Sequence, residues 1–411
     1  MYSTEQDARG GMRNVWIITI SMTILAICYT MIIPFLPIYL LELGVPKGDV
    51  ALWSGWVFGI TFLIAGIMAP VWGKIADNKG KKMMALRAGF AIAISYFLIG
   101  MVTDQYQLLL GRAFQGFANG FYPAAMTMVS LSVDEKKVGR ALGIFQTGLI
   151  LGNVVGPFLG GAVESIVGMR LVFYVSGVAV FLATVSVWLF VKEPKVQAEN
   201  DGTQDSKSAP KTTSLRDDFK TVRQQPVLVR LLWIFFFMQC AIMMLQPILA
   251  LYVGDMQGTM EGGAAIIAGS ILSIGGLAGG ALTTNIWVRI GERKGYFQTI
   301  SYCMIGSGIV LLLQSLPVGI WWFGILQVLI GSFIVGINPS LSAAVTLNTA
   351  PTFRGRMFGM TTTAQQFGSM VGPVFASIVS TYMGIAYVFS ITGLLLLYLG
   401  FQARRLSVHH D

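Results

Sequence analysis

The stretch GRALGIFQTGLILGNVVGP, residues 139–157, recurs 216 positions later as GRMFGMTTTAQQFGSMVGP, residues 355–373. Glycine and proline residues match at the same offset on both sides of this stretch, from Gly120 with Gly336 to Gly177 with Gly393. Matches at one constant offset over this length indicate an internal duplication. Two similar halves with glycine or proline interruptions in matching places are typical of alternating-access membrane transporters.

The sequence around this duplication is far more apolar than that of a soluble protein. Of its 411 residues, 55% are hydrophobic and 11% are charged, whereas soluble domains carry about 25% charged residues. Apolar runs long enough to cross a bilayer recur along the whole chain. We therefore predict an all-α membrane protein with twelve transmembrane helices in two pseudo-symmetric six-helix bundles. The helices are expected near residues 14–41, 51–73, 83–103, 106–131, 138–164, 169–191, 227–253, 264–287, 296–314, 319–347, 354–380 and 383–402.

A change of composition separates the two halves. Residues 192–226 are charged, rich in Ser and Thr and poor in apolar side chains, as expected of a solvated linker. The predicted domains are an amino-terminal bundle at 1–191, a cytoplasmic linker at 192–226 and a carboxy-terminal bundle at 227–411. The first apolar run is too long for the core of a signal peptide and is expected to remain as a helix.

The distribution of basic residues predicts the orientation in the membrane. If both termini are cytoplasmic, all of the 28 lysines and arginines except Lys47, Arg112 and Arg170 lie on the cytoplasmic side. This bias follows the positive-inside rule. It accounts for the net charge of +9, so we expect a lipid bilayer around the protein and no nucleic-acid partner.

The loop after the second predicted helix reads GKIADNKGKK, residues 73–82, and places one acid beside several cations. It resembles the signature loop of the major facilitator superfamily, with Asn78 where a basic residue is usual. The resemblance implies a conformational latch in which Asp77 rests near the start of the eleventh helix, where a helix N-terminus favours negative charge. The matching loop of the second half has Val288 in place of the acid. Candidate gating residues are Gly73, Asp77, Gly80, Lys81, Lys82 and Arg140.

The fifth predicted helix carries a glycine stripe that ends in GPFLGG, residues 156–161. Small residues at such spacing let a second helix approach closely, and Pro157 removes one helical hydrogen bond. The spacing resembles the antiporter motif of the superfamily's drug/proton branch, although plain helix packing would also use such a stripe. The motif residues are Gly143, Gly152, Gly156, Pro157, Gly160 and Gly161.

Arg112 in the fourth helix is the basic side chain expected within a span. A buried arginine in a bilayer is costly and normally faces the bundle interior or a water-filled cavity. The segment from Arg112 to Gly120 resembles the superfamily's helix-4 motif, whose arginine is associated with proton coupling; snorkelling to the membrane surface is the alternative. Arg112, Gln115, Asn119, Tyr122 and Met126 recur at steps of three and four, which predicts one shared helix face.

A substrate cavity is implied if helices 1, 4, 7 and 10 line it, as the resemblance suggests. Its wall would be aromatic, rich in methionine and without strong charge, which suits several amphipathic ligands. Each residue could equally be a packing residue. The candidates are Met31, Phe35, Tyr39, Gln115, Asn119, Tyr122, Met126, Phe237, Gln239, Met243, Gln246 and Asn338.

The sequence carries no motif for ATP hydrolysis, metal binding or covalent catalysis. We expect no catalytic residues, no metal and no cofactor, with a proton gradient as the driving force. No acid falls in the middle of a span, so Glu164 and Glu42, on the same membrane side as Arg112, are the proton-coupling candidates. We expect one of them to pair with Arg112. Cys28, Cys240 and Cys303 lie in apolar runs and are expected to be packing residues.

The resemblance covers essentially the whole chain and is greatest to bacterial twelve-span multidrug exporters of the quinolone and fosfomycin resistance type. It implies proton-coupled efflux of amphipathic small molecules by a monomer in the bacterial cytoplasmic membrane. A dedicated exporter of a metabolite or siderophore is the alternative, with Arg112 binding a substrate carboxylate. Uptake by symport and a non-transporting sensor or scaffold are further alternatives.

Overall fold

The computed structural model describes residues 2–193, 222–257, 263–277, 284–316, 319–350 and 353–407, and the regular structure within these ranges is helical. Each of the twelve predicted helices corresponds to one, two or three of the observed elements, and predicted helices 5 and 6 share one element. Within the described residues, eight helical segments are long and apolar enough to cross a membrane, and one of them, Lys137–Phe190, covers both predicted helices 5 and 6.

The amino-terminal bundle runs from the first helix to the end of the sixth. Tight turns at glycines with positive φ join helices 2 and 3 at Gly80 (φ 94°) and helices 5 and 6 at Gly168 (φ 76°). Asp104 caps the helix that follows it by accepting hydrogen bonds from the amides of Tyr106 and Gln107. The elements are α1 (Tyr2–Ile32), η1 (Ile33–Phe35), α2 (Leu36–Glu42), α3 (Lys47–Lys79), α4 (Lys81–Met101), α5 (Gln105–Ala118), α6 (Phe121–Leu131) and α7 (Glu135–Phe190), which spans both predicted helices 5 and 6.

The carboxy-terminal bundle repeats this pattern. Gly295 (φ 91°) and Gly384 (φ 104°) stand at the turns that correspond to Gly80 and Gly168. The elements are α9 (Pro226–Leu245), α10 (Leu249–Gln257), α11 (Gly263–Leu277), α12 (Thr284–Lys294), α13 (Tyr296–Gln314), α14 (Ile320–Ile334), α15 (Ile337–Leu347), α16 (Arg354–Met383) and α17 (Ile385–Ser407).

Helices 1, 4, 7 and 10, each predicted as continuous, are interrupted within their length. The interruptions are the 3-10 turn η1 in helix 1, Asn119–Gly120 in helix 4, residues 246–248 in helix 7 and Val335–Gly336 in helix 10. A proline follows or lies in the break in helices 1 and 7, and a glycine lies in it in helices 4 and 10. The interruptions therefore recur at equivalent places in the two halves.

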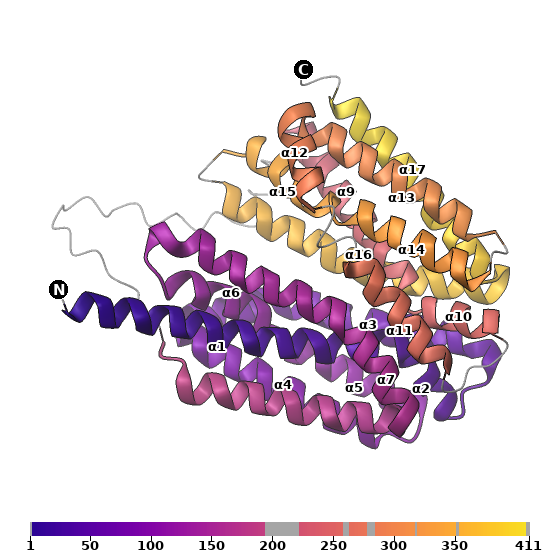
Figure 1. Ribbon diagram of the computed structural model, residues 1–411, viewed down its shortest axis with the longest axis horizontal. Coiled ribbons are helices and arrows are strands. Elements are labelled where there is room, and N and C mark those ends of the chain that lie inside the picture. The colour runs from indigo at the N-terminus through magenta and orange to yellow at the C-terminus, as the bar shows by residue number, and fades with distance from the viewer. Residues whose placement is uncertain are drawn as a thin grey trace.

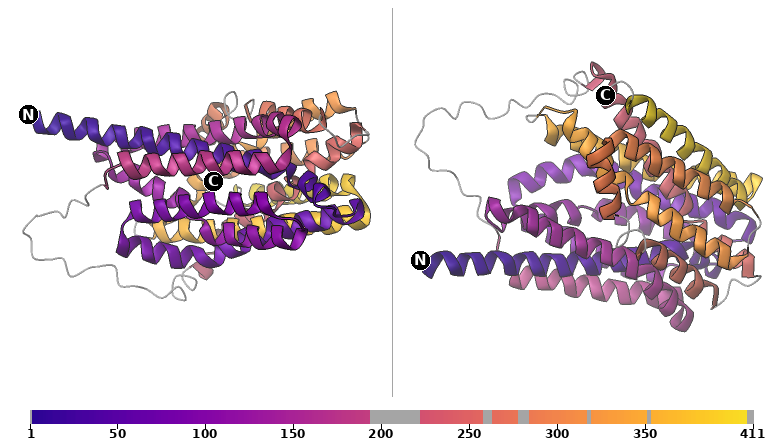
Figure 2. Two further views of the ribbon diagram at one scale, coloured as in Figure 1. Left: turned by 90° about the horizontal axis from the view of Figure 1, so that it is seen from below. Right: turned by 45° about the horizontal axis from the view of Figure 1, so that its top comes forward.

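The two bundles meet through two symmetry-related helix pairs, α3 with α16 and α7 with α11. Inside each bundle, the proline-containing helix packs along the first helix: α7 along α1, and α16 along α9. Figure 1 and Figure 2 show the bundles diverging from their contact toward the end of the molecule where both chain termini lie. We call this the terminal end and the opposite one the distal end.

Among the described residues, the packing between bundles is close in the distal half and becomes looser along α3 toward the terminal end. Gly55 of α3 has no room for a side chain, because Ser377 and the Pro373 carbonyl oxygen of α16 lie against it. Farther along α3, a Cβ at Gly66 would meet its nearest atom at 3.8 Å, and one at Gly73 would meet nothing within 4 Å. The bundles therefore lie closest together at the distal end, and their helices diverge toward the terminal end (Figure 1).

The linker begins in fixed contact with the amino-terminal bundle. The Asn14 side-chain amide donates to the Lys192 carbonyl at 3.0 Å, and the backbone amide of Lys82 donates to Glu193 Oε1 at 3.4 Å. Most of the predicted linker, residues 194–221, lies outside the described residues, and α9 begins at Pro226.

Candidate functional site

Arg112 is buried inside the amino-terminal bundle, with 3% of its surface exposed. Its Nη1 donates to Gln115 Oε1 at 2.6 Å, and its backbone carbonyl accepts a hydrogen bond from the Thr61 hydroxyl of α3 at 3.2 Å. Nε and Nη2 are buried without a hydrogen-bond partner among the described residues. The guanidinium therefore lies in the bundle interior rather than at the membrane surface.

The surroundings of Arg112 are aromatic. Its Cζ lies 5.9 Å from the ring centroid of Phe58, and the hydroxyls of Tyr29 and Tyr96 lie near enough for electrostatic interaction with the guanidinium. Neither tyrosine was predicted from the sequence, because no periodicity within helix 1 or 3 shows that they face helix 4. The expected pairing of Arg112 with Glu164 or Glu42 is absent from the ion pairs of the described residues.

The predicted shared face from Arg112 to Met126 is wrong in its second half. α5 ends at Ala118 and α6 begins at Phe121, so helical spacing does not continue through Asn119. Gly120 has φ 129°, a conformation that favours glycine and interrupts the helix. Beyond the break, the Tyr122 hydroxyl accepts a hydrogen bond from Gln146 of α7, Met126 is half-buried and Asn119 is exposed.

Glu164 and Glu42 lie together at the distal end of the amino-terminal bundle. Glu164 is 8% exposed, and its Oε2 is buried without a hydrogen-bond partner among the described residues. Glu42, at the end of α2, is exposed and lies near Glu164, Arg170 and the backbone of Met169. The two carboxyl groups therefore interact with each other, and Glu42 also with a cation of α7.

The glycine stripe of α7 packs directly on α1. Gly152, Gly156 and Gly160 each face backbone atoms of α1, at Thr23, Ile27 and Met31 respectively. Thr30 Oγ1 also reaches across to the Gly152 carbonyl at 3.2 Å. Gly161 is buried, whereas Gly143 is exposed and a side chain there would meet nothing within 4 Å. The stripe brings α1 and α7 into backbone contact, and Gly143 does not take part in that contact.

Pro157 lies at the contact between bundles. Its carbonyl oxygen lies against Gly269 of α11, and the next amide, Phe158 N–H, donates to Ser273 Oγ at 3.1 Å. The equivalent Pro373 carbonyl faces Gly55 of α3. In both halves, the proline that interrupts the helical hydrogen bonding therefore lies at a point of contact with the opposite bundle.

The candidate latch residues lie at the terminal end. Gly73 and Arg140 are exposed, Lys82 Nζ donates to the Trp188 carbonyl at 2.9 Å, and Lys81 has an interaction within the protein. Gly80 forms the turn between α3 and α4, next to Glu193. The side chain of Asp77 and residue Thr352, which the predicted latch would bring together, lie outside the described residues.

The predicted cavity residues fall in different environments. Met31, Phe35 and Tyr39 are buried, and the Tyr39 hydroxyl donates to the Ile99 carbonyl at 2.9 Å, so these side chains pack within the molecule in this conformation. On helices 7 and 10 the side chains are half-buried or exposed; they are Phe237, Gln239, Met243, Gln246 and Asn338.

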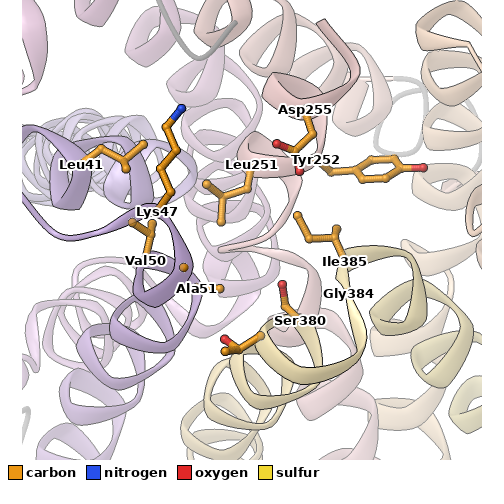
Figure 3. Close-up of a pocket in the computed structure, with 12 residues that line it drawn as sticks. Leu41, Lys47, Val50, Ala51, Leu251, Tyr252, Asp255, Ser380, Gly384 and Ile385 are labelled. Atoms are coloured by element: carbon orange, nitrogen blue, oxygen red, sulfur yellow. The ribbon is translucent and has the colours of Figure 1, made fainter. Parts of the chain in front are cut away.

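A cavity of about 420 Å³ lies between the bundles at the distal end (Figure 3). Lys47 and Val50 of α3 line one side, and Tyr252 and Asp255 of α10 line the other, with Ser380 at the end of α16. Lys47 and Asp255 interact electrostatically across the bundles. This pair was not predicted from the sequence, although Lys47 was one of the three basic residues that were expected to lie outside the cytoplasmic segments.

Two six-helix bundles, joined at one end around glycine- and proline-rich helices, define a secondary transporter fold. The sequence model of the Major Facilitator Superfamily matches residues 18–316 and 277–406 of this chain, and the chain belongs to this family. It is a multi-pass integral membrane transporter of small molecules and not an enzyme.

The chain is similar to several curated bacterial transporters. It is 30% identical to the multidrug resistance protein MdtG of Proteus mirabilis (strain HI4320) over 381 residues, 92% of both proteins. It is also 30% identical to the uncharacterized MFS-type transporter YuxJ of Bacillus subtilis (strain 168), over 89% of this chain and 91% of the relative. The predicted family and its multidrug branch are thereby confirmed.

Solved structures with the same fold include a mutant of the nucleoside transporter NupG, with a TM-score of 0.76, 14% identity, and coverage of 95% of this chain and 99% of that one. Another is a bacterial homologue of the human lysosomal transporter Spinster in an inward-facing and unoccupied conformation, with a TM-score of 0.75, 16% identity, and coverage of 97% and 98%. At these identities the likeness concerns the fold.

Proposed function

We propose that this protein exports amphipathic small molecules from the bacterial cytoplasm in exchange for protons. The observation that carries the proposal is the packing between bundles, which among the described residues is close in the distal half and looser toward the terminal end. When two bundles are in contact at one end only, they can rock about that contact, so that the opposite end closes as the first end opens. The similarity to multidrug resistance proteins supports efflux of several compounds.

The proposed orientation has both termini in the cytoplasm, which makes the observed opening inward-facing. The positive-inside distribution of lysine and arginine supports this orientation. The protein would act as a monomer, because two bundles supply a complete pathway, and it would need no cofactor.

Proton coupling would use Glu164, assisted by Glu42 and Arg112. Glu164 is a buried carboxyl group beside a second carboxyl group, that of Glu42, and a carboxyl group can bind and release a proton during the transport cycle. Arg112 lies deeper in the same bundle and would respond to the loss or gain of negative charge there. Latch residues at the terminal end, among them Asp77 and Arg140, would close the cytoplasmic side in the outward-facing state.

A dedicated exporter of a carboxylate compound is the second candidate. It is favoured by two nitrogen atoms of Arg112 that lack hydrogen-bond partners among the described residues, because a buried guanidinium can donate two parallel hydrogen bonds to a carboxylate. In this case the anion would neutralise the arginine, and Glu164 would play no part in substrate binding.

Transport by purified protein in proteoliposomes tests both candidates. With an imposed pH gradient, we expect movement of both ethidium, a lipophilic cation, and norfloxacin, a quinolone. Movement of benzoate, an anionic carboxylate, without movement of ethidium or norfloxacin would instead favour the dedicated exporter. Accumulation of all three compounds without a gradient requirement would contradict proton coupling.

A further inference from the structure

The break in helix 4 leaves backbone carbonyl groups without helical partners. The last carbonyls of any helix lack amides one turn ahead, and inside a membrane these groups must find donors in the protein. Here the carbonyls of Phe117, Ala118 and Asn119 precede Gly120, whose φ of 129° ends the helix. Asn119 Oδ1 accepts from the Gly120 amide at 2.7 Å.

Two side chains from neighbouring helices supply the missing donors. Trp72 of α3 donates its indole N–H to the Phe117 carbonyl at 2.9 Å. Arg87 of α4 donates to the carbonyls of Ala118 at 3.3 Å and Asn119 at 2.8 Å, and more weakly to Phe117 at 3.5 Å. The Arg87 Cζ also lies 3.6 Å from the centroid of the Trp72 ring, so the guanidinium stacks on the second donor.

In the second half, the hydrogen bonds of the described residues include no charged donor at the same place. Trp287 of α12 stands 215 residues after Trp72 and donates to the Ser332 carbonyl at 2.7 Å. At the offset of 215 that pairs Gly80 with Gly295, Arg87 corresponds to the uncharged Tyr302. The next residue, Cys303, has its Sγ against Gly336, as Arg87 Nη2 lies against Gly120. Gly336 has φ −75° and ψ −17°, so the chain between α14 and α15 stays close to helical.

We propose that Arg87 and Trp72 form a clamp that holds helix 4 broken at Asn119–Gly120. The clamp fixes α5, with Arg112 and Gln115, relative to α6, with Tyr122 and Met126. Because no charged side chain of the described residues lies against Gly336 as Arg87 lies against Gly120, helix 10 keeps a nearly continuous backbone and is free to bend. Arg87 is therefore a positioning residue, and the two bundles differ in stiffness at equivalent points. The clamp depends on the fold and is independent of the substrate or coupling ion.

Hydrogen exchange of the purified full-length protein in lipid nanodiscs tests the clamp. Arg87→Met removes the guanidinium donors but keeps an unbranched side chain of similar length. The loss of each hydrogen bond raises the equilibrium constant for local opening about fivefold. We expect amide exchange in peptides covering residues 117–124 to rise at least fivefold, while peptides covering residues 333–340 change less than twofold. Arg87→Lys, which keeps a cation with fewer fixed donors, should restore part of the protection.

Cys303→Ala is the matched control, because the Cys303 side chain lies against Gly336 in the second half. This variant is expected to alter exchange less than twofold at both breaks. Trp72→Phe, which removes only the indole donor, provides a milder test if Arg87→Met fails to fold. Unchanged exchange at residues 117–124 in Arg87→Met and Trp72→Phe would overturn the proposal. So would an equal rise across all peptides of α4, α5 and α6, since Arg87 would then support the whole bundle.

Discussion

At the scale of single residues, Arg112 is a buried cation, and its removal should lower the transport rate without lowering the stability of the protein. It makes one side-chain hydrogen bond, to Gln115, and leaves Nε and Nη2 unpartnered among the described residues. Burial of a charge without full compensation is costly, so Arg112→Ala should leave the unfolding temperature unchanged or slightly raised. Gradient-driven transport should fall at least tenfold. The two values can be measured by thermal unfolding in detergent and by flux in proteoliposomes; a joint fall of both would mean that Arg112 is a structural residue.

Glu164 should determine the response of transport to a pH gradient. Glu164→Gln keeps the shape and burial of the side chain but cannot bind and release a proton. We expect substrate to move down its own gradient at a near-normal rate while the imposed pH gradient no longer accelerates it. Glu42→Gln is the matched control and should reduce the acceleration only in part, because Glu42 is exposed and lies near Arg170. Full gradient dependence in both variants would remove the two acids from the proton pathway.

Residue-level predictions from the sequence succeeded where the signal lay within one helix. The spacing of Arg112 and Gln115 predicted a shared face, and the two side chains are hydrogen-bonded. Tyr29 and Tyr96, which come close to Arg112 from helices 1 and 3, left no such signal, because contacts between helices depend on rotation about each helix axis. Lys47 and Asp255 were likewise missed, since their proximity depends on how two separate bundles meet.

At the scale of helices, the glycine stripe of α7 should be sensitive to added volume at some positions and not at others. Gly156 lies against Thr30 and the Ile27 carbonyl of α1, so Gly156→Ala must push two backbones apart. Overpacking of this kind costs about 1–3 kcal/mol, which should lower the unfolding temperature by several degrees. Gly143→Ala is the control: nothing lies within 4 Å there, and alanine is the better helix former by about 1 kcal/mol. Equal effects at both positions would show that the stripe does not act through contact with α1.

The duplication predicted the helices well, but it could not predict their interruptions. The offset of 216 pairs Gly120 with Gly336, yet Gly120 has φ 129° and Gly336 φ −75°. Glycine permits both conformations at small cost, so the outcome depends on donors supplied from outside the helix. Arg87 and Cys303 make that difference, and they lie on other helices. A pattern within one helix therefore cannot distinguish a true break from a flexible point.

At the scale of the whole molecule, the distal contact should depend on pH through Asp255. Asp255 lies in the last turn of α10 and lines the distal cavity opposite Lys47. Partial burial raises the pKa of the Asp255 carboxyl above its ordinary value of 3.8, and the positive charge of Lys47 offsets part of this rise. When the bundles separate at this end, the carboxyl becomes hydrated and its pKa returns toward the ordinary value. The closed conformation therefore binds the proton more tightly, and linkage predicts that acid favours distal closure between the two pKa values.

The accessibility of a cysteine placed in the cavity wall would measure this closure. In a protein whose three native cysteines are replaced by serine, Val50→Cys reports on a buried wall position, and Gly48→Cys reports on the exposed rim of the same cavity. Each variant is alkylated with a membrane-impermeant maleimide, and the rate at Cys in place of Val50 is divided by the rate at Cys in place of Gly48. This ratio removes the pH dependence that the thiol reaction has at both positions. We expect this ratio to fall as the pH is lowered from neutral toward 3.8, the ordinary pKa of the carboxyl group, because acid favours closure in that direction. Adding Asp255→Asn, which mimics the protonated carboxyl, should make the ratio low and independent of pH. A ratio that rises in acid would mean that the attraction between Lys47 and ionised Asp255, rather than burial of the carboxyl, controls the distal end.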